Sequence, residues 1–228
     1  MGIRTSTDDT TSGLEAFSDH MLKIEITGPN QEHFTVIDVP GIFRVPSPPI
    51  TTDSDVAKVR DMVISRMHNK RTIILAVLPS NVDISTQEVL KMAEEADPEG
   101  SRTMGVLTKP DLMTEKATQE TINDLLLGKR NKLRLGFFVV KNRGADDERS
   151  TTSERIAEER TFFEKAVWTQ VKKTGRCGIP ALEARLRDLL RAISKTEFPH
   201  VKSDITKFLR ERRDELGSIG PSRQNASS

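Results

Sequence analysis

Strand and helix patterns alternate in the first two thirds of this 228-residue chain, and helical patterns alone fill its last third. Three runs are almost entirely apolar and cover residues 72–78, 103–107 and 136–140. Short uninterrupted runs of this kind are typical of parallel strands that are covered on both faces. Residues 21–26 alternate apolar with charged side chains, as a half-buried strand does, and residues 34–38 predict a further strand.

Helical patterns lie between these runs. Residues 55–69 carry apolar side chains at three- and four-residue spacing, which predicts an amphipathic helix, and 119–126 predict a weaker one. Ser85, with Glu88 three residues later, predicts a capping box in which Ser85 is the N-cap. The alternation predicts an α/β fold with a mostly parallel sheet and helical crossovers, followed by a helical extension.

The last third predicts two helices, one opened by Pro180 and one over residues 199–216, with a disordered polar tail from about 217. We therefore expect a flexible leading segment over residues 1–20, an α/β domain over 21–178 and helices over 179–228.

Composition restricts the class of function. The net charge of +1 gives no reason to expect nucleic-acid binding, and the single Cys177 cannot form an internal disulfide. No apolar run is long enough to span a bilayer, so we expect a cytoplasmic protein.

Two short motifs carry candidate chemistry. In Asp38-Val-Pro-Gly41 an acid ends a predicted strand, where its carboxylate could hold magnesium near a phosphate, although an ordinary turn explains these residues equally well. In Thr108-Lys-Pro-Asp111 the aspartate could accept both N–H groups of guanine, and the Lys109 stem could lie along the purine ring. A solvated proline turn is the alternative, and Lys109 and Asp111 disfavour adenine. Asn142-Arg143 follows the last predicted strand and could supply a third loop.

No Gly-x-x-x-x-Gly-Lys-Ser/Thr phosphate-binding loop occurs in these residues. With the motifs above in place, the chain resembles the GTPase domain of the dynamin superfamily, in particular its fungal dynamin-like and Mx-like branches. The residues that carry the resemblance are Val36–Ile42, Ile73–Asp83, Ala93–Gly100, Arg102–Leu112 and Val139–Arg143.

The resemblance implies a P-loop NTPase-like fold that binds GTP and Mg. It implies that Asp38, Val39, Pro40 and Gly41 contact the γ-phosphate, with Asp38 reaching Mg through water. It implies that Thr108, Lys109, Pro110 and Asp111 read guanine, and that Asn142 and Arg143 form the final nucleotide loop. Asp83 is similar to an acid through which two GTPase domains pair, although a plain loop acid before a helix explains it as well.

The resemblance further implies homo-oligomers formed through the GTPase domain and a stalk. It extends to membrane remodelling, organelle fission, microtubule binding and peripheral association with organelle membranes. Without the phosphate-binding loop and a first-switch threonine, we expect this incomplete domain to show no hydrolysis alone. The alternative function is a non-catalytic remnant that associates with full-length relatives.

Overall fold

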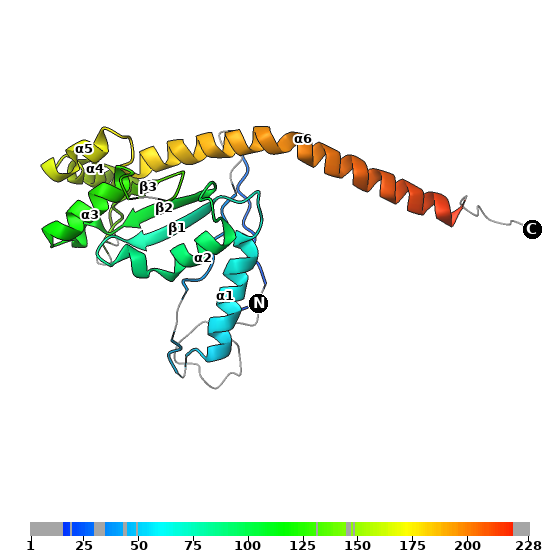
Figure 1. Ribbon diagram of the computed structural model, residues 1–228, viewed down its shortest axis with the longest axis horizontal. Helices are drawn as coiled ribbons and strands as arrows, with labels where there is room; N and C mark the ends of the chain where they lie inside the picture. Colours follow the sequence, from blue (N-terminus) through cyan, green and yellow to red (C-terminus); the bar gives the residue numbers. More distant parts are fainter. Residues whose placement is uncertain are drawn as a thin grey trace, which may run out of the picture. The chain divides into compact units, whose positions relative to one another are not determined.

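A computed structural model describes residues 16–18, 20–29, 35–42, 45–48, 50–130, 132–144, 147 and 149–220 (Figure 1). Most of the predicted leading segment, Phe34 of the predicted strand over 34–38, and the end of the predicted tail lie outside these residues. The chain divides into two compact units, residues 1–183 and 184–228.

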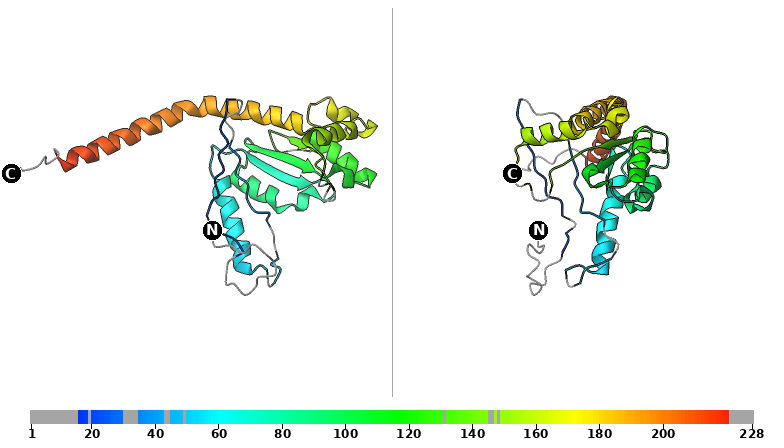
Figure 2. Two further views of the ribbon diagram at one scale, coloured as in Figure 1. Left: turned by 180° about the vertical axis from the view of Figure 1, so that it is seen from behind. Right: turned by 90° about the vertical axis from the view of Figure 1, so that its left-hand side faces the viewer.

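The first unit contains a parallel sheet of three strands in the order β1-β2-β3. These strands are β1 (Ile74–Pro79), β2 (Thr103–Thr108) and β3 (Phe137–Val139), which confirms the three apolar runs as parallel strands. Their arrows point the same way in Figure 1 and, from behind, in Figure 2.

Helices connect and follow the strands. The α-helices are α1 (Asp53–Met67), α2 (Glu88–Ala96), α3 (Lys116–Leu126), α4 (Thr152–Phe162), α5 (Thr169–Lys172) and α6 (Ile179–Ile219). Short 3₁₀ turns form η1 (Ile84–Thr86), η2 (Pro110–Leu112) and η3 (Ala166–Trp168). The fold is thus α/β with a helical C-terminal part, as the alternation predicts.

One face of the sheet carries the main core. The register aligns Leu78 with Leu107 and Leu107 with Val139, so these side chains lie on the same face. They pack against Ile122 and Leu126 of α3 and against a second group of buried side chains. That group comprises Phe163, Trp168 and Val171, in which the Trp168 ring meets the Phe163 ring edge-on at 5.3 Å.

Strand β1 is covered on one face only. Its buried residues alternate with exposed ones, and Val77 is 56% exposed. The prediction of cover on both faces is confirmed for β2 and β3, whose apolar residues are buried throughout, and is wrong for β1. Within the described residues β1 is also an edge strand, so its outer side has no partner.

Two predicted strands do not form. Residues 21–26 and 35–38 have no regular structure, and Ile24 and Val36 are largely exposed. A strand needs a neighbour to satisfy its backbone N–H and C=O groups. Neither segment has one among the described residues, so alternation alone does not produce a strand there.

The helix ends also differ from prediction. Helix α2 begins at Glu88 without a side-chain cap, and Ser85 instead donates from its amide to Asp83, so the capping box at Ser85 is wrong. Helix α6 runs unbroken through Pro199 and ends at Ile219, beyond the predicted start of the tail. A proline removes one backbone hydrogen bond, and the helical turns on both sides of Pro199 keep the helix continuous without that bond.

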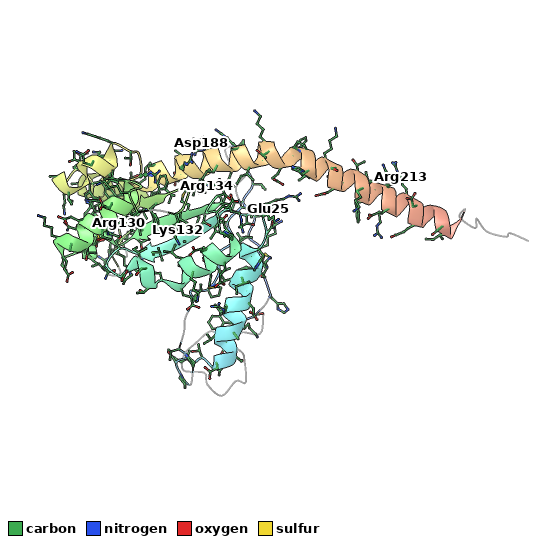
Figure 3. The ribbon with its side chains drawn as sticks, in the orientation of Figure 1. Glu25, Arg130, Lys132, Arg134, Asp188 and Arg213 are labelled. Carbon is green, nitrogen blue, oxygen red and sulfur yellow. The ribbon has the colours of Figure 1, made fainter. Side chains whose placement is uncertain are left out.

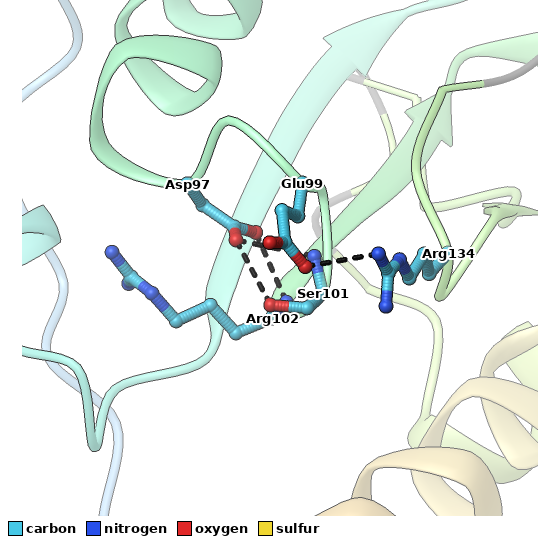
Figure 4. A network of polar contacts seen from close by, with 5 residues as sticks. All are labelled: Asp97, Glu99, Ser101, Arg102 and Arg134. Carbon is cyan, nitrogen blue, oxygen red and sulfur yellow. Dashed lines mark hydrogen bonds and ion pairs between the residues drawn. The ribbon is translucent and has the colours of Figure 1, made fainter.

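The buried carboxylate of Asp97 joins the end of α2 to the start of β2 (Figure 4). One oxygen accepts hydrogen bonds from the amide and hydroxyl of Ser101, both at 3.1 Å. The other accepts from the Arg102 amide at 3.0 Å and the Thr103 hydroxyl at 2.6 Å. Burial by itself would raise the pKa of Asp97, but these four hydrogen bonds together lower it below its usual range.

Replacing Asp97 with alanine should destabilise the first unit by about 2–4 kcal/mol, because four donors lose a buried acceptor. Urea unfolding at neutral pH measures the loss. As the control, Glu99→Ala removes the exposed ion pair with Arg134 and should change little.

The pH dependence gives a second readout for Asp97. A lowered folded-state pKa means that its stabilisation is complete above the unfolded pKa of about 3.9 and is lost as pH falls through the folded pKa. Wild type should therefore lose more stability below pH ~4 than Asp97→Asn. Equal losses in the two proteins would contradict this role for Asp97.

Candidate functional site

Three of the four predicted motifs share one edge of the sheet. The strands are parallel, so their carboxyl ends meet at the same edge. Thr108 is the last residue of β2, Asn142 lies three residues after β3, and Asp83 lies four residues after β1. Ligands of open α/β sheets bind at this edge.

The loop after β2 presents two charged side chains on a fixed base. Lys109 and Asp111 are exposed, whereas Pro110 and Met113 are buried. The Thr108 hydroxyl donates to the carbonyl of Leu78 at 3.2 Å, which ties the loop to β1. The side chains of Lys109 and Asp111, two residues apart in the sequence, therefore both face solvent, while the backbone of the loop is anchored.

The backbone of Lys109 is strained. Among the described residues it alone combines a side chain with a positive φ, at φ 53° and ψ 45°. The left-handed conformation costs roughly 1–2 kcal/mol for residues other than glycine, and a residue before proline is normally extended. Strain of this kind, held by surrounding structure, concentrates at functional sites.

The remaining two motifs at this edge are exposed loops. Asn142 is exposed, and Arg143 donates to the carbonyl of Ser150 at 3.3 Å. The side chain of Asp83 accepts hydrogen bonds from the hydroxyl of Ser85 at 2.7 Å and from its amide at 2.9 Å, and these bonds lower the pKa of Asp83.

The fourth motif, Asp38 to Gly41, lies elsewhere. Val39 and Ile42 pack against the cluster of Val63, Met67, Ile74, Met92 and Ala93. That cluster includes the first residue of β1, whereas Thr108 is aligned with the last. The structure therefore does not bring Asp38 to the edge that carries the other three motifs. A side chain added at Gly41 would meet no atom within 4 Å.

A hollow of about 910 Å³ lies between α2 and α3. Among the predicted site residues only Asp83 lines it. Arg130 and Lys132, from the loop before β3, lie on its rim and are seen with Arg134 in Figure 3. Lys132 pairs with Glu94 at 3.0 Å, so an ion pair joins the loop before β3 to α2.

A second buried carboxylate holds the loop after β3. Glu159 is 2% exposed, and its two oxygens accept from the amides of Lys141 and Ile179, each at 2.8 Å. Burial, and then the negative charge of Glu159, raises the pKa of the neighbouring Cys177 to about 12. Cys177 is thus a neutral thiol at physiological pH.

Metal and membrane features are limited in the part of the chain that the structure describes. No three His, Cys, Asp or Glu side chains there gather as a metal site, and none of the helices there is long and apolar enough to cross a bilayer. A single carboxylate such as Asp38 fits magnesium only together with phosphate oxygens and water.

Two family models match nearly the whole chain. The Dynamin family model covers residues 2–110, and the Dynamin central region model covers residues 121–228. The chain belongs to the dynamin family. The first match ends inside the loop after β2, at Pro110, and so includes β1, β2 and the residues around Asp38.

Similar proteins are named as Mx proteins. The interferon-induced GTP-binding protein Mx1 of Equus caballus is 36% identical over 208 residues, which are 89% of this chain and 31% of that protein. Mx2 of Oncorhynchus mykiss is 36% identical over 222 residues, 96% of this chain and 34% of that protein. The chain thus spans about a third of the length of these curated relatives.

Sequence reasoning assigned no role to Ser80 or Asp97. Both are polar residues near strand ends: Ser80 follows β1 directly, and Asp97 follows α2 six residues before β2. A buried polar residue must find hydrogen-bond partners. Their position beside a strand end is the signal that could have identified them.

We expect Lys109→Gly to leave the protein at least as stable as the wild type. Glycine adopts the left-handed conformation freely, and the relief offsets the entropy that glycine adds to the unfolded chain. The free energy of unfolding should be unchanged or higher by up to about 1 kcal/mol.

Urea unfolding of Lys109→Gly checks this expectation. The matched control is Lys70→Gly, at an exposed turn lysine without positive φ, which should lose stability. A stability loss at Lys109 as large as the loss at Lys70 would show that the conformation carries no strain.

Proposed function

We propose that this chain forms part of a dynamin-type GTP-binding and GTP-hydrolysing domain, and that the Thr108–Asp111 loop reads guanine. The observation that carries the proposal is the strained Lys109, held on an anchored loop at the carboxyl edge of a parallel sheet. The names of the Mx relatives, which are GTP-binding proteins, agree with it.

In this proposal the Asp111 carboxylate accepts hydrogen bonds from the ring N–H and the exocyclic amine of guanine. The aliphatic stem of Lys109 covers the base, and Asn142 and Arg143 close the other side. A charged hydrogen bond contributes roughly 1.5–3 kcal/mol, whereas micromolar affinity needs about 8 kcal/mol. Base contacts alone therefore support affinity near the millimolar range.

Phosphate and magnesium contacts belong to Asp38, Val39, Pro40 and Gly41 in this proposal. Magnesium, when bound, neutralises phosphate charge, and Asp38 supplies one carboxylate to its shell, through water. For that, the segment over residues 35–42 has to lie at the carboxyl edge of the sheet, next to Thr108.

A second candidate function is association with relatives or with further copies of the chain. The second unit favours it, because α6 exposes one apolar stripe at helical spacing, in which the Arg212 guanidinium lies 5.0 Å from the centre of the Phe208 ring. The stripe comprises Phe198, Val201, Ile205, Phe208, Leu209 and Leu216. We propose that this stripe and Asp83 serve self-assembly, with organelle membranes or microtubules as the targets of the full-length protein.

Asp111→Asn tests the base assignment. An asparagine side chain can donate to the exocyclic oxygen of xanthine, so preference should shift from GDP toward XDP. Titrations of each diphosphate, followed by amide chemical shifts at millimolar concentration, measure the ratio of dissociation constants. Asp61→Asn, an exposed acid on α1, is the matched control. An unchanged preference in Asp111→Asn would refute the proposal.

Hydrolysis is the second test. Phosphoryl transfer depends on positioning and charge neutralisation at the phosphates, and these 228 residues contain no phosphate-binding loop motif. We expect phosphate release from GTP by the chain alone to equal the enzyme-free blank. Turnover above the blank that Asp38→Ala abolishes would instead show that this chain completes a catalytic site by itself.

A further inference from the structure

The carbonyl group of Thr108 is held unusually firmly. Its oxygen accepts two hydrogen bonds from the same residue, Ser80: one from the amide at 2.8 Å and one from the hydroxyl at 2.7 Å. Ser80 is completely buried, so water does not compete for this contact. Both acceptor positions of the Thr108 carbonyl are thereby filled.

The contact lies where the ladder between β1 and β2 ends. Pro79 is aligned with Thr108 but has no backbone N–H, so Ser80 carries the next amide that can reach β2. The Thr108 hydroxyl returns a bond to the Leu78 carbonyl at 3.2 Å. The ends of β1 and β2 are thus joined by hydrogen bonds donated in both directions at Thr108, the last residue before the loop.

The fixed carbonyl is part of the peptide bond between Thr108 and the strained Lys109. Because Ser80 sets the plane of the Thr108–Lys109 peptide, it restricts the backbone rotation that would let Lys109 relax from φ 53° to an extended conformation. The turn of η2 then closes through the Leu112 amide, which donates to the Lys109 carbonyl at 3.1 Å. The direction of Asp111 follows from this turn.

We infer that Ser80 is a positioning residue for base selectivity: its hydroxyl holds the loop in the conformation that aims Asp111 at the base. The inference rests on the proposed function, because it assigns Ser80 to the same guanine-reading loop. Ser80 itself does not touch the nucleotide in this account.

The test compares Ser80→Ala with Ser101→Ala in the full 228-residue chain. Each variant removes one serine hydroxyl that forms a hydrogen bond at one end of β2, to the Thr108 carbonyl or to Asp97. GDP and IDP are the probes, because inosine lacks the exocyclic amine from which Asp111 would accept a hydrogen bond. For Ser80→Ala the ratio of the IDP to the GDP dissociation constant should fall by roughly three- to tenfold, the value of one hydrogen bond. For Ser101→Ala it should stay at the wild-type value.

Amide hydrogen exchange without nucleotide gives a readout that is independent of the proposed function. In Ser80→Ala the Leu112 amide should exchange faster, and in Ser101→Ala it should not. An unchanged Leu112 rate, or an unchanged IDP to GDP ratio beside clear guanine selectivity in the wild type, overturns the role of Ser80. Equal binding of GDP and ADP by the wild type overturns the proposed function, and the selectivity role falls with it. Faster exchange of the Leu112 amide in Ser80→Ala would then show only that the Ser80 hydroxyl fixes the loop.

Discussion

Strand β2 is fixed at both ends by hydrogen bonds from residues outside the strand, and the first unit is organised around it. Asp97 binds its first residue and the two residues before it, and Ser80 binds its last residue. Between these ends β2 is buried and pairs with a strand on either side. Because neither end can shift along the strand without breaking buried hydrogen bonds, the loops at the carboxyl edge start from a defined position.

The stretch that most clearly resembles the family has a structural part before β2 and an exposed charged part after it. Asp97 to Arg102 joins α2 to the sheet at the amino end, where a glycine is also required. Gly100 has φ +59°, and a side chain added there would lie 2.7 Å from the Lys132 carbonyl oxygen. At the opposite end, Thr108 to Asp111 carries the exposed charged groups. The residues that make the family recognisable are thus as much structural as chemical.

The sequence predicted those parts of the fold that depend on local pattern. Residues 103–107 and 136–140 form strands as expected, because runs of apolar residues require cover on both faces. Residues 21–26 and 35–38 do not, because a strand depends on a neighbour that no local pattern specifies. For the site, the placement of Thr108, Asn142 and Asp83 at one edge of the sheet follows from parallel strands, whereas the packing of Val39 and Ile42 depends on tertiary contacts. The strain at Lys109 could not be predicted, since no simple pattern places lysine in a left-handed conformation before proline.

Glu159 connects the first turn of α6 with the loop after β3 through a single rigid group. One oxygen holds the amide of Ile179 and the other holds the amide of Lys141, which precedes Asn142. A carboxylate is planar, so its two oxygens move together. The segment before α6 is also bonded to β3, because Val139 donates to the carbonyl of Arg176 at 3.0 Å and accepts from the amide of Gly178 at 2.8 Å. The start of α6 is therefore fixed to the end of β3 twice, by the Glu159 carboxylate and by backbone hydrogen bonds to Val139.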